Sequence, residues 1–139
     1  MRNQVVQHLD YLDVREDVYV SVGFTPDLSK KMQGVTFYLN LSGASACPII
    51  KVLIDSRMSS AKQKLVLAHE MIHVKQYVKG ELLVLSKRQV LWKGRKHNYQ
   101  PGNCQKEPWE LEAYKKDNLL AKRCKLPVES PLVASVENR

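Results

Sequence analysis

Cysteine, glycine and proline are all scarce in this 139-residue sequence, which contains three Cys, six Gly and six Pro. No two cysteines have the CxxC spacing, so we expect reduced thiols in a cytoplasmic protein. The low Gly and Pro content excludes collagen-like chains and Pro/Gly-rich disordered chains. No apolar run approaches the roughly 18 residues of a membrane span, and the first residues lack the apolar region of a secretory signal. We therefore expect a globular, cytoplasmic protein without a membrane partner.

Acidic residues are also few: 14 Asp and Glu stand against 22 Lys and Arg, which gives a formal net charge of +8 and a pI near 9.5. This surplus favours anionic partners such as nucleic acid. No five like charges are consecutive, however, and a soluble domain with a basic surface explains the composition slightly better. Weak binding of nucleic acid or another polyanion therefore remains one of two open interpretations. The residues that suggest it are Lys87, Arg88, Lys93, Arg95 and Lys96.

The hydrophobic pattern predicts a single α+β domain over residues 1–126 and a tail over 127–139. Segments with helical spacing of apolar residues are interspersed with segments of period two. The expected elements are helices over 3–14, 60–78 and 108–123, strands over 18–22, 35–41 and 49–54, and a hairpin or extended flap over 82–93. Residues 94–107 are expected to be irregular. The strand over 35–41 should be half-buried, with Val35, Phe37 and Leu39 on one face, and the more apolar strand over 49–54 should be covered on both faces.

The helix over 60–78 is the element on which the functional prediction depends. Ser60 and Gln63 have the spacing of a capping box, and Gly80 follows as a natural stop. Apolar residues lie on nearly all sides of the helix, which predicts a position in the centre of the domain. Its middle nevertheless contains the polar pattern HExxH.

In this pattern His69 and His73 are four residues apart, so both imidazoles lie on one face of the helix. Two imidazoles at this spacing can occupy neighbouring positions around a single Zn²⁺. Glu70 follows the first histidine, beside the metal but not bound to it, where its carboxylate can accept a proton from a water molecule. Since burying an unpaired carboxylate costs several kcal/mol, two core histidines with an unpartnered acid are a poorer explanation.

A catalytic zinc requires a third protein ligand. A third histidine six residues after His73 is excluded because Lys79 occupies that position. His97 is one candidate, and a carboxylate at the start of the helix over 108–123 is a better one. Glu110 and Glu112 both lie there, and the small Ala113 permits close packing of that helix on the HExxH helix.

Together these motifs resemble the gluzincin group of zinc metallopeptidases, and most of all its small single-domain members from bacteria and their phages, with HExxHxxQ followed by PWExEA. The resemblance implies a zincin-like α+β fold, in which a small, mainly antiparallel sheet over 17–55 packs on the HExxH helix. It also implies Glu110 as the third ligand, with Glu112 as a supporting residue or the alternative ligand. Relatives often have Asp or Asn immediately after the alanine, where this chain has Tyr114. Gln76 matches the glutamine of the family and is expected to take over part of that role.

The expected activity is zinc-dependent hydrolysis of a protein or peptide substrate, with Glu70 as general base and Tyr99 as a candidate donor to the oxyanion. Two alternatives remain. One is a DNA-associated protease or adaptor, suggested by the basic residues of 87–96. The other is a non-catalytic zinc protein, for example in a phage particle, although a purely structural site has no need of Glu70.

Overall fold

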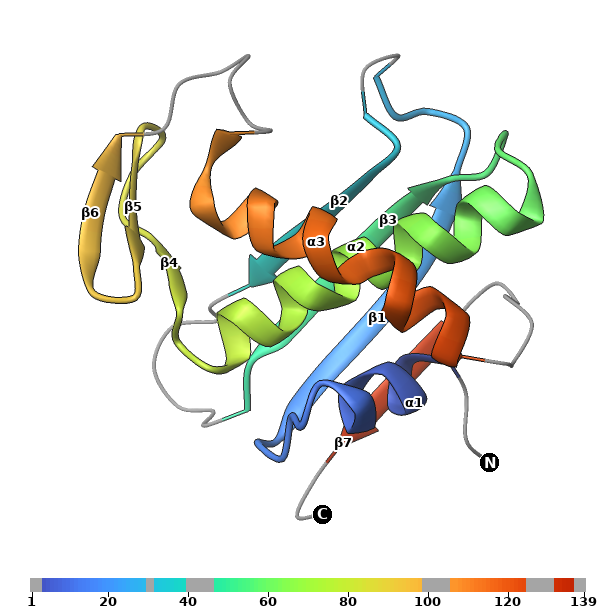
Figure 1. Ribbon diagram of the computed structural model, residues 1–139, viewed down its shortest axis with the longest axis horizontal. Helices are drawn as coiled ribbons and strands as arrows, with labels where there is room; N and C mark the ends of the chain where they lie inside the picture. Colours follow the sequence, from blue (N-terminus) through green and yellow to red (C-terminus); the bar gives the residue numbers. More distant parts are fainter. Residues whose placement is uncertain (1–3, 30–31, 40–46, 99–105, 125–131, 137–139) are drawn as a thin grey trace.

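The computed structural model describes residues 4–29, 32–39, 47–98, 106–124 and 132–136. Over these residues the chain forms three helices and two small sheets, which confirms the predicted α+β class. Helices α1 (Gln4–Tyr11) and α2 (Ser60–Val78) cover one face of the larger sheet, and α3 (Pro108–Arg123) packs across α2 (Figure 1). No helix in the described part is both long and apolar enough to cross a membrane.

The larger sheet is mixed, with strand order β2–β3–β1–β7. Its strands are β1 (Val18–Thr25), β2 (Gly34–Leu39), β3 (Ile49–Asp55) and β7 (Leu132–Val136). β3 is inserted between β2 and β1, antiparallel to the first and parallel to the second. Two of the three described pairings are antiparallel, which confirms the prediction of a mainly antiparallel sheet. The central pair is parallel, because β1 and β2 follow each other in the chain without being neighbours. The expected tail over 127–139 contains β7, which pairs antiparallel with β1.

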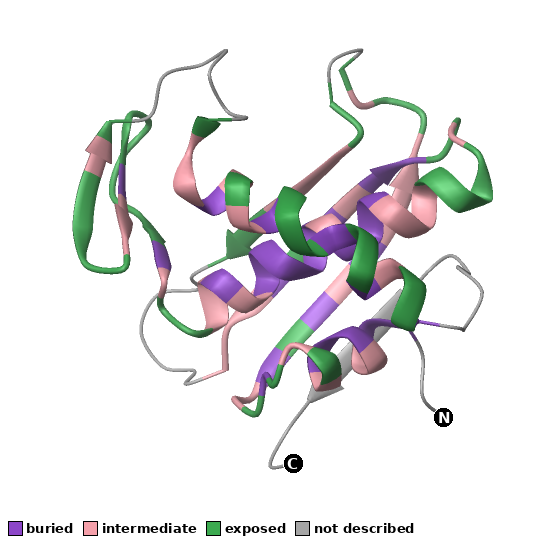
Figure 2. Cartoon of the chain, viewed as in Figure 1, coloured by how far each residue is buried: buried purple, intermediate pink, exposed green. Residues whose placement is uncertain are grey.

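The core lies between this sheet and α1 and α2 (Figure 2). Alternate residues of β1 and β3 point into it, while the residues between them point to the other face. The buried strand residues are Val18, Val20, Val22, Ile50, Val52 and Ile54. Lys51 on the opposite face is exposed, so the prediction that β3 is covered on both faces is wrong. β3 is apolar because it is a central strand of the sheet, with helices on one side.

Strand β2 presents its polar face to the helices. Thr36 is paired with Val52 and therefore lies on the same face of the sheet, toward α2. The expected apolar face of β2 points the other way, and Phe37 and Leu39 are 44% and 43% exposed. The prediction that this face is buried is wrong, because pairing with β3 decides which face each β2 residue takes.

The ends of α2 are fixed by local contacts, and its predicted bounds are confirmed. The N-cap is Ser59, one residue earlier than expected, and its hydroxyl accepts a hydrogen bond from the Lys62 amide at 3.2 Å. The side chain of Gln63 donates instead to the carbonyl groups of Ser56 and Met58. Gly80 ends the helix with φ +72°, a conformation that glycine adopts without strain.

A second sheet of three antiparallel strands follows α2. It consists of β4 (Leu82–Val84), β5 (Gln89–Trp92) and β6 (Arg95–Asn98). The predicted hairpin over 82–93 is thereby confirmed, whereas β6 occupies part of a region that was expected to be irregular. The five basic residues noted in the sequence are all exposed on this sheet and its turns (Figure 2).

His8 on α1 is completely buried, and neither ring nitrogen has a hydrogen-bond partner among the described residues. Burial, reinforced by the charge of Lys64, lowers the pKa of His8 from 6.5 to about 4. The unfolded chain therefore binds one more proton than the folded chain between these two values. This side chain makes the fold sensitive to acid.

We expect the free energy of unfolding to fall by about 3 kcal/mol through His8 alone as the pH is lowered from 7.5 to 4, and this loss to level off below pH 4, where the folded protein also binds the proton. Urea unfolding of the wild-type protein and of His8→Leu at both pH values measures the contribution of His8 to this loss of stability. The variant has no proton to take up at this position, so it should lose about 3 kcal/mol less than the wild type. Equal losses would show that His8 is not the titrating group.

Candidate metal centre

Helices α2 and α3 approach closely because small residues lie at their contact. Ala68 and Ala113 are fully buried there, in a cluster with Ile72 and Leu120. Glu110 lies one turn before Ala113 and faces α2. The close packing that Ala113 led us to expect thus brings the carboxylate of Glu110 to the two histidines of the HExxH motif.

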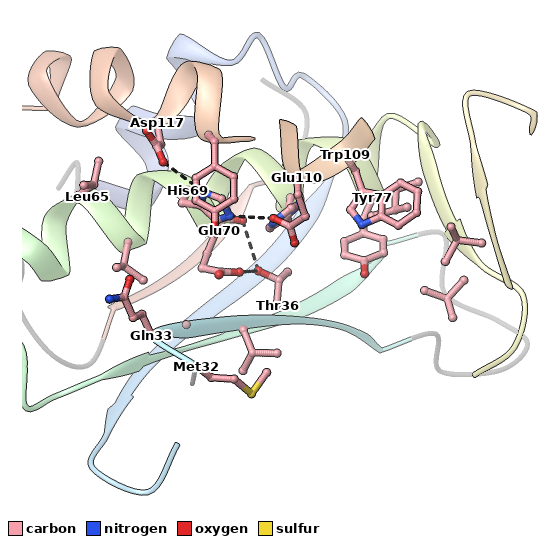
Figure 3. Close-up of a pocket in the computed structure, with 18 of the residues that line it drawn as sticks. Met32, Gln33, Thr36, Leu65, His69, Glu70, Tyr77, Trp109, Glu110 and Asp117 are labelled. Carbon is pink, nitrogen blue, oxygen red and sulfur yellow. Dashed lines mark hydrogen bonds and ion pairs between the residues drawn. The ribbon is translucent and has the colours of Figure 1, made fainter. Parts of the chain in front are cut away.

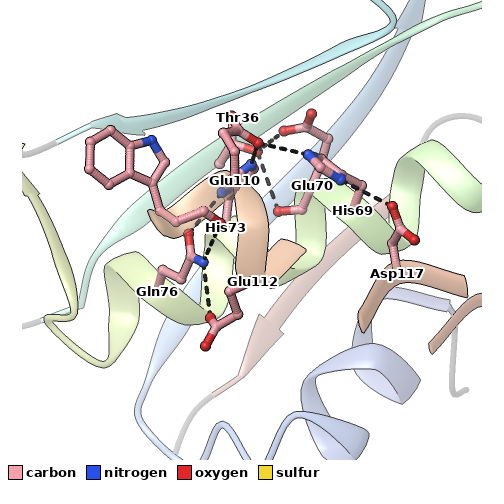
Figure 4. A network of polar contacts seen from close by, with 9 residues as sticks. Thr36, His69, Glu70, His73, Gln76, Glu110, Glu112 and Asp117 are labelled. Atoms are coloured by element: carbon pink, nitrogen blue, oxygen red, sulfur yellow. Dashed lines mark hydrogen bonds and ion pairs between the residues drawn. The ribbon is translucent and has the colours of Figure 1, made fainter. Parts of the chain in front are cut away.

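Three potential ligand atoms converge at this contact (Figure 4). The Nε2 atoms of His69 and His73 lie 3.0 and 2.9 Å from the same oxygen, Oε1 of Glu110. All ligand atoms of the group are within 4.8 Å of one another. Two imidazole nitrogens and one carboxylate oxygen form a donor set that suits zinc and leaves room for a fourth ligand. The three residues predicted as metal ligands are therefore brought together.

The other ring nitrogens are held by acceptors. Nδ1 of His69 lies 3.2 Å from Oδ2 of Asp117, and Nδ1 of His73 lies 2.8 Å from Oε1 of Gln76. A proton on each Nδ1 can be donated to these oxygens, which leaves the lone pair of each Nε2 directed at Glu110. This is the tautomer that a metal ion requires. The contact of Gln76 with His73 supports the role expected for Gln76, and Asp117 holds the ring of His69 in the same way.

Glu112 is placed away from the two histidines. Its Oε1 accepts hydrogen bonds from Gln76 at 2.9 Å and from Lys75 at 3.1 Å. Burial raises the pKa of Glu112, but these hydrogen bonds outweigh it and lower the pKa to about 2. Glu112 therefore stabilises the residue that orients His73, and in this arrangement Glu110 alone of the two acids faces the histidines.

Glu70 is buried beside the ligand group, with its carboxylate directed at strand β2. The hydroxyl of Thr36 donates a hydrogen bond to Oε2 of Glu70. At Gly34 the strand passes so close to α2 that a Cβ would lie 3.1 Å from Oε1 of Glu70 and 2.7 Å from Val66. Burial raises the pKa of Glu70 despite the opposing effects of His73 and Thr36. A carboxylate with a raised pKa, fixed in one orientation, is suited to general-base chemistry near neutral pH.

The negative charge of the cluster favours a cation at the point where the Nε2 atoms converge. Burial lowers the pKa of His73, but the hydrogen bond to Glu110 and the charge of Glu70 outweigh burial and raise the pKa to about 9. Burial raises the pKa of Glu110, and the hydrogen bonds from His69 and His73 reverse this and bring the pKa to about 2. A divalent cation supplies the compensating charge that protons otherwise provide, so metal binding should release protons.

The ligand group opens into a cavity of about 850 Å³ (Figure 3). Strand β2 forms one wall, from Gly34 to Thr36, and the hairpin of β4 and β5 closes one end. Tyr114 also lines the cavity, with its ring centroid 4.5 Å from that of His69. His97 instead packs its ring against Trp109 and is not part of the ligand group. Tyr99, the candidate oxyanion donor, lies outside the described residues.

Two residues of the site were missed in the sequence. Asp117 lies seven residues after Glu110, two helical turns along the same face of α3, so the spacing alone could have indicated it. Thr36 had no comparable signal. Its contact with Glu70 depends on the register of β2 against β3, which no local pattern specifies.

Asp117→Ala should lower zinc affinity about 10–100-fold, because the ring of His69 loses the acceptor that fixes its tautomer. Asn118→Ala, a change at the neighbouring residue of the same cavity wall, is the matched control and should leave the affinity close to that of the wild type. Competition with a chromophoric chelator measures both. If the two variants bound zinc equally well, Asp117 would have no part in orienting the ligand.

Comparisons with known proteins give no independent assignment, since no protein-family model, curated protein or solved structure matches the chain. The functional argument therefore depends on the chemistry of these residues.

Proposed function

We propose that this protein is a zinc-dependent peptidase of gluzincin type, with a zincin-like arrangement of sheet and helices. The observation that carries the proposal is the convergence of His69, His73 and Glu110 beside the buried carboxylate of Glu70. The three ligands account for a metal site. Glu70 accounts for catalysis, since its hydrogen bond to Thr36 holds a base next to the metal without making it a ligand.

When bound, Zn²⁺ supplies Lewis-acid chemistry that lowers the pKa of water and polarises a carbonyl group. Glu70 accepts a proton from the attacking water as the new C–O bond forms at the scissile carbonyl. Glu70 then donates this proton to the amide nitrogen as the C–N bond breaks. The products are a carboxylate and an amine, and the carboxylate of Glu70 is regenerated.

The position of β2 suits an extended peptide as substrate. Among the described strands β2 lies at the edge of its sheet: it is bonded to β3 on one side, and its residues line the cavity on the other. The backbone groups along such an edge can pair with a peptide as an additional strand. A peptide in this position lies along Thr36 and Gly34, directly over Glu70.

A purely structural zinc site is the weaker explanation. It needs three or four ligands with their supporting residues, which Asp117 and Gln76 provide. It gives no reason to bury Glu70 at a site where its own desolvation raises its pKa. A buried carboxylate whose pKa is raised by desolvation is expected where it serves a reaction.

The test is hydrolysis of an unfolded protein such as casein by the purified full chain. The zinc-loaded protein should cleave casein, EDTA should stop cleavage, and added Zn²⁺ should restore it. A zinc-loaded, folded protein that leaves casein and other unfolded polypeptides intact would contradict the proposal.

A further inference from the structure

The cavity continues beyond the ligand group into an apolar end beneath the β4–β5 hairpin (Figure 3). The apolar side chains of this end are Tyr77, Leu82, Val84, Val90 and Trp109, and Ser86 and Lys87 of the same hairpin also line the cavity. Leu82, Val90 and Trp109 form a small core cluster of their own, with Tyr77 packed against it. The wall is therefore preformed, and we name this end of the cavity the hairpin subsite.

Val84 is the exposed residue of the hairpin subsite: 55% of its surface is accessible to solvent, whereas Leu82, Val90 and Trp109 are buried. It is paired with Val90, so both side chains lie on the face of the hairpin that lines the cavity. The preceding residue, Leu83, is paired with Leu91 on the opposite face, and neither of these two lines the cavity. An exposed valine over a buried apolar wall is an arrangement that gains stability when an apolar group covers it.

The chain direction of strand β2 indicates on which side of the scissile bond the hairpin subsite lies. Thr36 contacts Glu70 at the ligand group, and two residues later Tyr38 stacks on Tyr77 with ring centroids 5.6 Å apart. β2 therefore runs from the ligand group toward the hairpin. Antiparallel pairing is the more stable arrangement, and a peptide paired in this way runs from the hairpin toward the ligand group. Its residues at the hairpin end precede the bond that is cut.

We propose that the hairpin subsite binds a large apolar or aromatic side chain of the residue on the N-terminal side of the scissile bond. This inference builds on the proposed peptidase function and assigns its specificity to Val84 and the wall behind it. A preference from one apolar contact of this kind amounts to about 10–200-fold between a large side chain and none.

Two hydroxamates that bind through a metal-chelating group test this without turnover. N-acetyl-phenylalanine hydroxamate places its ring on the N-terminal side of the chelating group, and N-acetyl-glycine hydroxamate has no side chain there. The zinc-loaded wild-type protein should bind the first at least about tenfold more tightly in calorimetry. A 2-benzylsuccinyl hydroxamate has the same ring on the C-terminal side, and its affinity should exceed that of N-acetyl-glycine hydroxamate by much less.

Val84→Asp should reduce the Phe/Gly ratio to near one, because it places a charge where the ring binds. Leu83→Asp is the matched control: it puts the same charge on the neighbouring exposed residue, which faces away, and should keep the wild-type ratio. A wild-type ratio near one, an equal loss in both variants, or a preference for the benzylsuccinyl compound would each overturn the proposal.

The hydroxamate experiment tests the hairpin subsite and the casein assay tests the peptidase proposal, so either proposal can be contradicted without the other. If casein is cut while the Phe/Gly ratio is near one, the hairpin subsite is wrong and the peptidase proposal stands. If the ratio is large and depends on Val84 while casein remains intact, the subsite stands and the proposed hydrolysis is wrong. Mass spectrometry of casein fragments adds a direct readout, with cleavage expected after Phe, Leu, Tyr or Met.

Discussion

Glu70→Gln is expected to reduce casein hydrolysis about 10²–10⁴-fold while the protein still binds one zinc per chain. Glutamine fills the same buried volume, and its amide can still form a hydrogen bond with Thr36. It cannot accept the proton of the attacking water, so the reaction loses its base. The ligands His69, His73 and Glu110 are unchanged, which is why metal binding should persist.

The rate and the zinc content should be measured on the same preparation, by release of fluorescent casein fragments and by elemental analysis. Glu16→Gln is the control for loss of a single carboxylate, since Glu16 pairs with Lys79 away from the cavity. It should cut casein at the wild-type rate. Wild-type hydrolysis by Glu70→Gln would mean that another group accepts the proton, and the proposed mechanism would be wrong.

Glu110→Gln should weaken zinc binding by more than the ~10–100-fold that is typical when an orienting residue is lost, because it removes an anionic ligand. Glu112→Gln is a closely matched comparison. Both carboxylates are partly buried, both have a pKa lowered to about 2, and both are changed to the same isosteric amide. Only Glu110 faces the histidines, and after Glu112→Gln the side-chain amide oxygen can still accept the hydrogen bond from Gln76, so this variant should lose far less affinity than Glu110→Gln.

Thermal unfolding with and without zinc provides a second measurement. A ligand at a thousandfold excess over its dissociation constant stabilises the folded state by about 4 kcal/mol, and Glu110→Gln should show little of this gain under the same conditions. If Glu112→Gln loses zinc and Glu110→Gln keeps it, the ligand assignment is reversed. If both variants retained zinc, neither Glu110 nor Glu112 would be a metal ligand.

The helical part of the site could be predicted from the sequence because it depends on local spacing. The bounds of α2 follow from a capping serine and Gly80, and the start of α3 follows from Pro108. Residues four apart on a helix share a face wherever the helix lies, so the common face of His69 and His73 could be predicted without any tertiary contact. Ala113 further indicated where the two helices meet.

The sheet was predicted less well because strand pairing is not local. Nothing within residues 35–41 shows that β3 inserts between β1 and β2, and that pairing turns Thr36 rather than Phe37 toward the helices. The contact of Thr36 with Glu70, and the edge on which a peptide can lie, both follow from this one choice of neighbour. Strand β7 was missed for the same reason, since its partner β1 is more than a hundred residues earlier in the chain.

Gly34 determines how closely strand β2 can approach α2. A single methyl group there would meet both the side chain of Val66 and the carboxylate of Glu70. Substitution at this position would move the base or the strand and leave His69, His73 and Glu110 in place. The histidines and Glu110 could then still hold a metal, while Glu70 would lose the position that the proposed mechanism requires. Loss of the glycine is therefore a route by which a descendant of this protein could keep the candidate metal site and lose the proposed activity.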